Sequence, residues 1–417
     1  MGRVLAGGTD EPSEARRDPM SGDIMRRGRR SRIFRDATMA FLAEWLLGFA
    51  SQGGTSVGLL LHCFGLIRDG DPTSWIAVFT LATEREAERA AATERAGRKR
   101  EAAAAWLSAS VAAKASLMLT HPVGPSLVGA IEAMRDGFAH FLRLAAPDVV
   151  PLQVPFRDGC MRGYASEGIE AADLAVLILG GGDTFAEDLW FLGGRALHEA
   201  GIAFAAVDLP GQGDAPLQGW YFGADTLEGL TATLDTLHAR GLAGELVLLG
   251  WSGGGIFVTK YASLARPEDR LRAVIGATPI HDVGAFFAAA LPSVLRRPDS
   301  PLARAAMALA RRHPVRRVLL AKYDWQFGPT GIAGMIASAA TLGRTELEDL
   351  DLPVLALVGG SEDAEALRQA AAVVDAVRPR HPASDVVVFD GWTGADAHCQ
   401  VGNLDLALER VIGWLTA

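Results

Sequence analysis

The amino-acid sequence predicts an α/β protein with a mostly parallel sheet. After about residue 150, short apolar runs alternate with helical segments, and continuous apolar strands of this kind are typical of a parallel sheet with helices on both faces. A motif rich in glycine follows one of these runs and opens a helix. The expected strands are residues 174–179, 202–209, 245–249, 273–277, 354–358 and 386–389.

The remaining elements of this half follow from local patterns. Two apolar runs, 152–157 and 161–165, flank Asp158-Gly159 and predict a hairpin before the parallel strands. The helical segments expected between the strands include 184–200, 226–240, 254–265 and 364–377. Residues 283–348 interrupt the alternation and are helical, which predicts a lid inserted into a core that covers 151–417.

The first part of the chain has the period of helices. Apolar residues recur at spacings of three and four along one segment and form a stripe on one helix face: Leu127, Ile131, Met134, Phe138, Phe141 and Leu142. We therefore expect a helical cap domain over residues 34–150. Residues 1–33 are polar and rich in Gly and Arg, and we expect a disordered tail there.

Composition excludes several classes of function. The formal net charge is −9, whereas non-specific nucleic-acid binding needs a basic surface. The three cysteines, Cys63, Cys160 and Cys399, form neither a disulfide framework nor a zinc motif. No run reaches the roughly 18 apolar residues of a membrane span. We expect a cytoplasmic protein that acts on a small molecule, with no metal, nucleic acid or membrane partner.

Ser252 is the candidate nucleophile. The segment 250–254 reads Gly-Trp-Ser-Gly-Gly and matches the Gly-x-Ser-x-Gly pattern of a nucleophile elbow. It directly follows an expected strand and opens an expected helix, which is the structural context that the pattern needs. The alternative is a turn rich in glycine with a structural serine. The small neighbours suit a strained turn.

The base and the acid should lie on later loops. His398 is on a loop after the last expected strand and before the closing helix, whereas His281 follows a strand that precedes the insertion and is interpreted as a hydrogen-bonded group at a strand end. The loop after 354–358 carries Glu362 and Asp363. We prefer Asp363 as the acid that orients the histidine and keep Glu362 as the alternative. The order serine, acid, histidine is the one that such elbows use.

Two backbone N–H groups should stabilise the oxyanion of a transition state. One is expected from Gly253, which follows the nucleophile. The other is expected from Gly182, in the Gly180-Gly181-Gly182-Asp183 loop after the strand 174–179. This loop lacks the Gly-x-Gly-x-x-Gly spacing of a dinucleotide site, so no such cofactor is expected.

These segments resemble one branch of the α/β hydrolases. The matching segments are 180–183, 208–213 (Asp-Leu-Pro-Gly-Gln-Gly), 250–254, 395–400 (Ala-Asp-Ala-His-Cys-Gln), and in the first domain 67–71 with Ser74-Trp75. The branch includes FrsA-like esterases, 2,6-dihydroxypseudooxynicotine hydrolase and fungal hydrolases that shorten polyketides. The resemblance implies an α/β-hydrolase fold with a helical domain packed over the active site.

The resemblance also implies hydrolysis of an ester, or of a carbon–carbon bond next to a ketone, in a small hydrophobic and polyketide-like molecule. Gly182 stands where the branch has a bulkier residue, which implies a wider pocket. A biosynthetic lyase, cyclase or acyltransferase is the alternative, because the same three residues could serve it if water were excluded. A non-catalytic scaffold is disfavoured by the intact set.

The apolar face of the first domain must be buried against something. We expect these helices, together with the 283–348 insertion, to wall the substrate pocket at the carboxyl ends of the strands. The alternative is a dimerisation surface elsewhere on the molecule, which would make the protein a homodimer.

Overall fold

A computed structural model describes residues 33–328 and 330–417. Its centre is one eight-stranded sheet in the order β1-β2-β4-β3-β5-β6-β7-β8. The hairpin strands β1 and β2 are antiparallel, β2 pairs antiparallel with β4, and all later neighbours are parallel. The strands are β1 (Val149–Phe156), β2 (Gly159–Ser166), β3 (Leu174–Leu179), β4 (Ala203–Val207), β5 (Glu245–Trp251), β6 (Leu271–Ala277), β7 (Val354–Gly359) and β8 (Asp385–Phe389).

The mostly parallel α/β sheet predicted from the sequence is therefore confirmed. Alternate residues of β3 enter two different cores, with Val176 and Ile178 on one face and Leu177 and Leu179 on the other. Burial on both faces explains why this strand reads as a continuous apolar run. The helices that cover the sheet are α6 (Gly194–Glu199), α7 (Ala224–Ala239), α8 (Gly253–Ala262), α13 (Ala364–Val377) and α14 (Leu404–Leu415).

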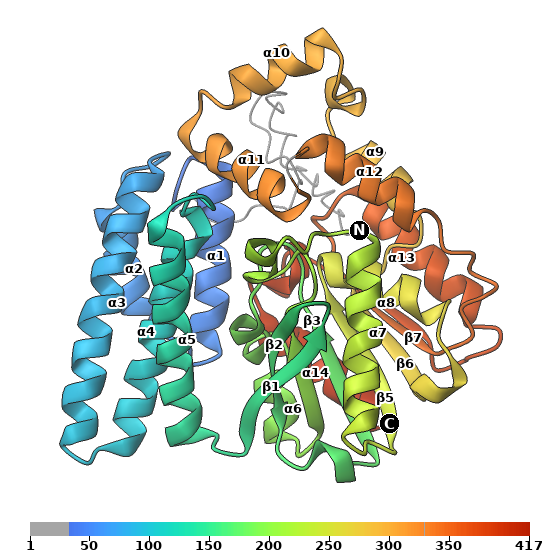
Figure 1. Ribbon diagram of the computed structural model, residues 1–417, viewed down its shortest axis with the longest axis horizontal. Helices are drawn as coiled ribbons and strands as arrows, with labels where there is room; N and C mark the ends of the chain where they lie inside the picture. Colours follow the sequence, from blue (N-terminus) through green and yellow to red (C-terminus); the bar gives the residue numbers. More distant parts are fainter. Residues whose placement is uncertain (1–32, 329) are drawn as a thin grey trace, which may run out of the picture.

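In the described part of the chain, five helices precede the sheet, and they stand beside it (Figure 1). The stripe predicted on 127–142 lies on α5, and its six apolar residues are buried. The five helices are α1 (Ala37–Ser51), α2 (Val57–Leu66), α3 (Pro72–Arg95), α4 (Lys99–Leu119) and α5 (Pro125–Ala145). The tail expected over 1–33 lies outside the described residues, apart from Ile33.

Among the described residues, α4 is the one helix whose length and composition would allow it to cross a membrane, and 94% of its most apolar window is buried inside the protein. It packs against both α3 and α5. Its apolar character therefore matches its position at the centre of the helical domain.

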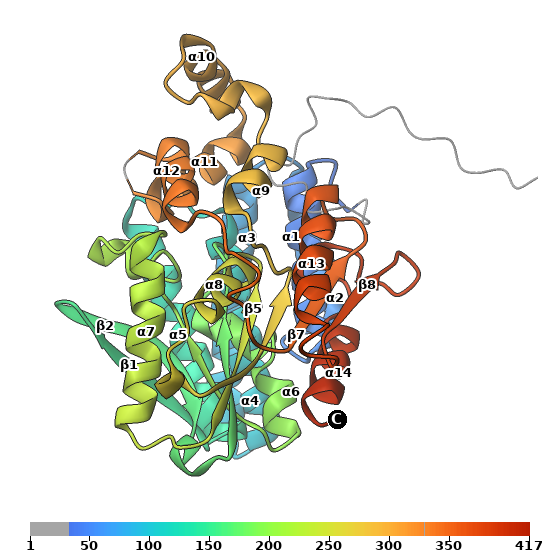
Figure 2. The ribbon, with the colours of Figure 1, turned by 90° about the vertical axis from the view of Figure 1, so that its right-hand side faces the viewer.

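The interruption of the α/β pattern is a group of helices between β6 and β7. They lie beyond the carboxyl ends of the strands, at the top of both views (Figures 1 and 2). They are α9 (Val283–Ala290), α10 (Pro301–Ala310), α11 (Pro314–Gln326) and α12 (Ile332–Leu342). Short 3-10 turns complete the chain: η1 (Ile169–Ala171), η2 (Ala186–Trp190), η3 (Ala215–Gln218), η4 (Pro267–Asp269), η5 (Ser293–Arg296) and η6 (His398–Gln400).

Candidate active site

Ser252 lies on a sharp turn between β5 and α8. Its backbone has φ 55° and ψ −121°, a left-handed conformation that costs free energy in any residue with a side chain. A β-carbon on Gly250 would lie 2.3 Å from the Gly254 carbonyl oxygen, and one on Gly254 would lie 2.6 Å from the Leu179 oxygen. The turn therefore requires glycine at 250 and 254, whereas Gly253 has ordinary contact distances. The strained turn expected from the motif is present.

His398 joins this serine to a carboxylate. Its Nε2 lies 2.9 Å from Ser252 Oγ, and its Nδ1 lies 2.8 Å from Glu362 Oε2. The three residues come from the turn after β5, the loop after β7 and the turn after β8. Parallel strands bring these carboxyl ends to one edge of the sheet, so residues up to 146 positions apart share one site.

The preference for Asp363 as the partner of His398 is wrong, and the alternative, Glu362, occupies that place. Asp363 is the N-cap of α13, where its carboxylate accepts a hydrogen bond from the Glu365 backbone N–H at 3.0 Å. A capping side chain bonds the free N–H groups of its own helix. An aspartate immediately before an expected helix is a capping signal, and that signal could have separated the two carboxylates.

The Glu362 carboxylate is held by more than the histidine. Its Oε1 accepts hydrogen bonds from Thr278 Oγ1 at 2.9 Å and from the Gly359 backbone N–H at 3.0 Å. Its side chain is only 6% exposed. Thr278 had no motif to mark it in the sequence. These contacts fix the carboxylate and leave Oε2 directed at the imidazole.

The surroundings of His398 favour its protonated form. Burial lowers the pKa of the imidazole, but the neighbouring Cys399 sulfur and the Glu362 carboxylate outweigh burial and raise the pKa from 6.5 to about 10. The Glu362 carboxylate stabilises an imidazolium, which is the ion formed when a histidine accepts a serine proton.

The loop after β3 touches the nucleophile. A β-carbon on Gly181 would lie 2.6 Å from Ser252 Cβ and 2.9 Å from the Gly253 nitrogen, so this position needs glycine. The Gly181 carbonyl accepts a hydrogen bond from Thr184 Oγ1 at 3.0 Å. Because a trans peptide directs its N–H opposite to its carbonyl, the Gly182 N–H points away from Thr184. Gly182 and Gly253, the two expected donors, both line the main cavity beside Ser252.

The same loop is held from two other parts of the chain. Lys114 of α4 donates to the Asp183 carbonyl at 2.5 Å and forms an ion pair with Asp188 at 2.6 Å; both side chains are almost fully buried. From the insertion, the Gln326 amide donates to the Gly182 carbonyl. No sequence motif indicated either contact. Helical domain, insertion and core thus meet at one loop.

A second charged group lies between the helical domain and the core. Arg135 of α5 binds both carboxylate oxygens of Asp214 at 2.7 and 2.9 Å, and its Nε lies 3.5 Å from Glu187. Glu187 also accepts a hydrogen bond from Tyr164 at 2.9 Å. Burial and the Glu187 charge raise the pKa of neighbouring Asp208 well above its usual range.

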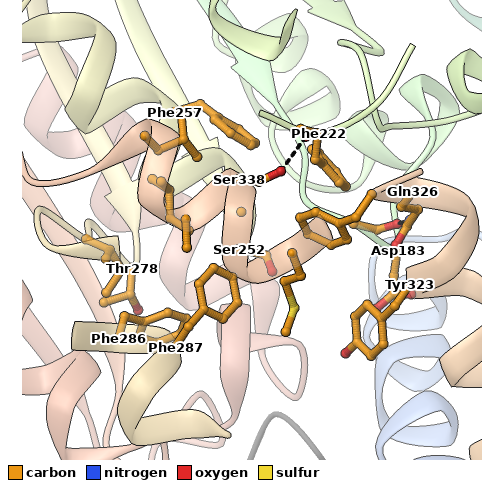
Figure 3. Close-up of a pocket in the computed structure, with 18 of the residues that line it drawn as sticks. Asp183, Phe222, Ser252, Phe257, Thr278, Phe286, Phe287, Tyr323, Gln326 and Ser338 are labelled. Carbon is orange, nitrogen blue, oxygen red and sulfur yellow. Dashed lines mark hydrogen bonds between the residues drawn. The ribbon is translucent and has the colours of Figure 1, made fainter. Parts of the chain in front are cut away.

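The main cavity opens above Ser252 and has a volume of about 110 Å³. Its walls are largely apolar, include several phenylalanines, and come mostly from the insertion and from α8 (Figure 3). In Figure 3, labelled phenylalanines lie on either side of Ser252, and Ser338 donates a hydrogen bond to the Phe222 carbonyl at 2.8 Å. The apolar lining residues are Phe222, Ile256, Phe257, Ile280, Phe286, Phe287, Tyr323, Phe327, Met335, Ala339, Leu342 and Ala366.

The expectation for the pocket walls is met only in part. The insertion lines the main cavity, but no residue of the 34–150 helices does. Of those helices, α1 lines a smaller cavity at the serine, in which Phe41 and Trp45 accompany Ser252 and His398. The domain is therefore on the same side of the sheet edge as the serine, but it does not form the larger wall.

His281, interpreted as a hydrogen-bonded group at a strand end, is hydrogen-bonded through its backbone, whose N–H donates to Gln369 Oε1 at 3.1 Å, but not through its ring. Its ring is buried, yet neither ring nitrogen has a hydrogen-bond partner among the described residues. Burial lowers its pKa. Within 33–328 and 330–417, no group of three or more His, Cys, Asp or Glu side chains could hold a metal ion.

Comparison with known proteins agrees with this geometry. A family model described as serine aminopeptidase, S33, matches residues 192–382. The solved structure of 2,6-dihydroxy-pseudo-oxynicotine hydrolase superposes with a TM-score of 0.64 and 19% identity, covering 88% of this chain and 94% of that one. AbyA5 superposes with a TM-score of 0.57 and 19% identity, covering 91% and 99%. The likeness to these two solved structures shows that the chain has the α/β-hydrolase fold.

Curated fungal α/β hydrolases are similar to parts of this chain. The α/β hydrolase xenA of Xenoacremonium sinensis is 25% identical over 251 residues, which cover 56% of this chain and 58% of the relative. The α/β hydrolase gkaG of Penicillium citrinum is 29% identical over 174 residues, covering 40% and 41%. The matched segments of these two relatives thus span about half of their length.

Proposed function

We propose that this protein is a serine hydrolase in which Ser252, His398 and Glu362 act as a catalytic triad. The observation that carries the proposal is the unbroken chain of contacts from Ser252 Oγ through both imidazole nitrogens to a buried carboxylate, at 2.9 and 2.8 Å. Nucleophile and base lie within hydrogen-bond reach, and a third group orients the base, which is the arrangement required of an activated serine.

In the proposed reaction, Ser252 Oγ attacks a substrate carbonyl carbon while its proton moves to His398 Nε2. The N–H groups of Gly253 and Gly182 stabilise the oxyanion. His398 then gives the proton to the leaving group, and an acyl-enzyme remains on Ser252. A water molecule loses a proton to His398 and attacks the acyl carbon. The bond from that carbon to Ser252 Oγ then breaks, His398 returns the proton to Oγ, and the acid is released.

The substrate class follows from the cavity. Walls of phenylalanine, isoleucine and leucine select a bulky apolar molecule, because burial of apolar area contributes roughly 25 cal/mol per Å². The fungal relatives include a protein named 20-hydroxy-prefusarin hydrolase from Gibberella moniliformis, 29% identical over 176 residues. This supports an ester, or a carbon–carbon bond next to a ketone, in a polyketide-like molecule as the target.

The test is labelling with a fluorophosphonate, followed by peptide mass spectrometry. We expect one modified residue, Ser252, and no labelling of Ser252→Ala. Turnover of an activated ester in ¹⁸O-water should place one ¹⁸O in the released acid. If the fluorophosphonate modifies Ser252 but the product contains no ¹⁸O from water, hydrolysis is contradicted. That result would favour elimination, cyclisation or acyl transfer by the same triad.

A further inference from the structure

Ser252 and His398 border two cavities. The main cavity lies under the insertion. The second, smaller cavity reaches the same two side chains from α1 and the segment after His398. Its apolar lining residues are Phe41, Trp45, Leu192, Trp251, Cys399 and Val401. A scissile carbonyl placed at Ser252 can therefore direct its two substituents into different spaces.

The two spaces differ in size. The small cavity has a volume of about 20 Å³, against about 110 Å³ for the main one. Since roughly 10–15 Å³ of such volume holds one water molecule, the small cavity has room for one or two heavy atoms. Phe41 and Trp45 are 2% and 5% exposed, and their ring centroids are 6.1 Å apart within the main core cluster. Close-packed walls of this kind do not widen without cost.

The order of the chemical steps decides which substituent each cavity holds. The acyl group stays on Ser252 after the first step, whereas the leaving group must depart before water can enter. A small cavity closed by core side chains can hold a retained group but cannot release a large one. Asp183 lines both cavities, and its acidic side chain disfavours substrates with a terminal carboxylate.

We propose that the small cavity is the acyl subsite, and that the substrate is an ester of a two- or three-carbon uncharged acyl group with a bulky apolar alcohol. This inference rests on the proposed hydrolase function. The bulky alcohol occupies the cavity lined by the insertion, and the short acyl group lies against α1. The helical domain then sets acyl length, while the insertion selects the alcohol.

The test uses p-nitrophenyl acetate, propionate, butyrate and hexanoate, with active sites counted by fluorophosphonate titration so that only folded enzyme is scored. We expect kcat/KM to fall at least tenfold from acetate to hexanoate in the unmodified protein. Phe41→Leu, and the more disruptive Phe41→Ala, should raise the hexanoate-to-acetate ratio about tenfold or more, because one methylene in an apolar pocket changes rates by roughly 10–200-fold.

Met335→Ala is the matched control, because Met335 is equally buried but lines only the main cavity. Its hexanoate-to-acetate ratio should stay at the unmodified value. Two results would overturn the acyl subsite while leaving the hydrolase function intact. One is hydrolysis that depends on Ser252 but is faster for hexanoate than for acetate. The other is a hexanoate-to-acetate ratio that changes in the Met335 variant and not in the Phe41 variants. Ester turnover that survives in Ser252→Ala would instead remove the proposed function.

Discussion

Two adjacent carboxylates have different partners, and substituting each one separates catalysis from folding. In Glu362→Gln, the amide oxygen can keep the hydrogen bonds from Thr278 and Gly359, so its NH₂ group would face His398 Nδ1. A donor at that place forces the proton of the neutral imidazole onto Nε2. The ring then cannot accept the serine proton.

The expected loss in kcat is roughly 10³- to 10⁴-fold, since the change leaves the geometry intact but stabilises the wrong tautomer. This corresponds to about 4–5.5 kcal/mol in the activation free energy. Asp363→Ala should instead remove the α13 cap and cost about 0.5–2 kcal/mol of stability. Its kcat should stay within a few-fold of the unmodified value.

The assay is steady-state hydrolysis of p-nitrophenyl acetate, normalised to titrated active sites, together with the free energy of unfolding from urea denaturation. The two variants should show opposite patterns: low activity with normal stability for Glu362→Gln, and normal activity with lower stability for Asp363→Ala. A loss of activity in Asp363→Ala as large as that in Glu362→Gln would refute the assignment of Glu362.

Three further predictions follow from the same contacts. The pKa of His398 is raised, and only neutral imidazole accepts the serine proton, so kcat/KM should increase with pH through a midpoint above 6.5. Glu362→Gln should move that midpoint to lower pH. An unmoved midpoint would contradict this. Lys114→Met should release the loop that carries an oxyanion donor, and should therefore lower kcat roughly 10–100-fold with little change in KM. The binding of a boronic-acid inhibitor should weaken by the same factor. Equal losses in Arg135→Met would instead indicate a general effect of the domain interface. Because the pKa of Asp208 is raised in the folded protein, its contribution to stability is present at low pH and is lost as the pH rises from the unfolded-state value of about 3.9 through the higher folded-state value. Asp208→Asn should therefore gain stability relative to the unmodified protein as the pH rises over this interval in urea denaturation, and a constant difference would contradict this.

Local patterns in the sequence were sufficient to predict the strands and two of the three side chains in the proposed triad, Ser252 and His398. β3 is buried on both faces, so its six residues form an apolar run that needs no knowledge of its neighbours. The elbow at Ser252 is recognisable because its strained turn requires glycine two residues before and two residues after the serine. His398 stands out because it is on the last post-strand loop, and parallel strands bring such loops together.

The choice between Glu362 and Asp363 depended on where each carboxylate points, and only the tertiary structure shows that. The capping position of Asp363 is a local signal that a closer interpretation could have used. The contacts of Thr278, Lys114 and Gln326 leave no local trace, because each joins elements that are distant in sequence.

The division of the pocket was likewise beyond the sequence. Amphipathic helices show that a face must be buried, but not against which part of the core. Any apolar surface can bury such a face equally well. The apolar period of α1 to α5 therefore could not show which cavity these helices line. Packing placed the insertion over the larger cavity and left Phe41 and Trp45 beside the smaller one. The sequence by itself determined where strands, helices and reactive side chains follow one another along the chain, because these depend on local period and motif. The partners of each side chain and the shape of the cavity depend on contacts between distant segments, so only the tertiary structure decided them.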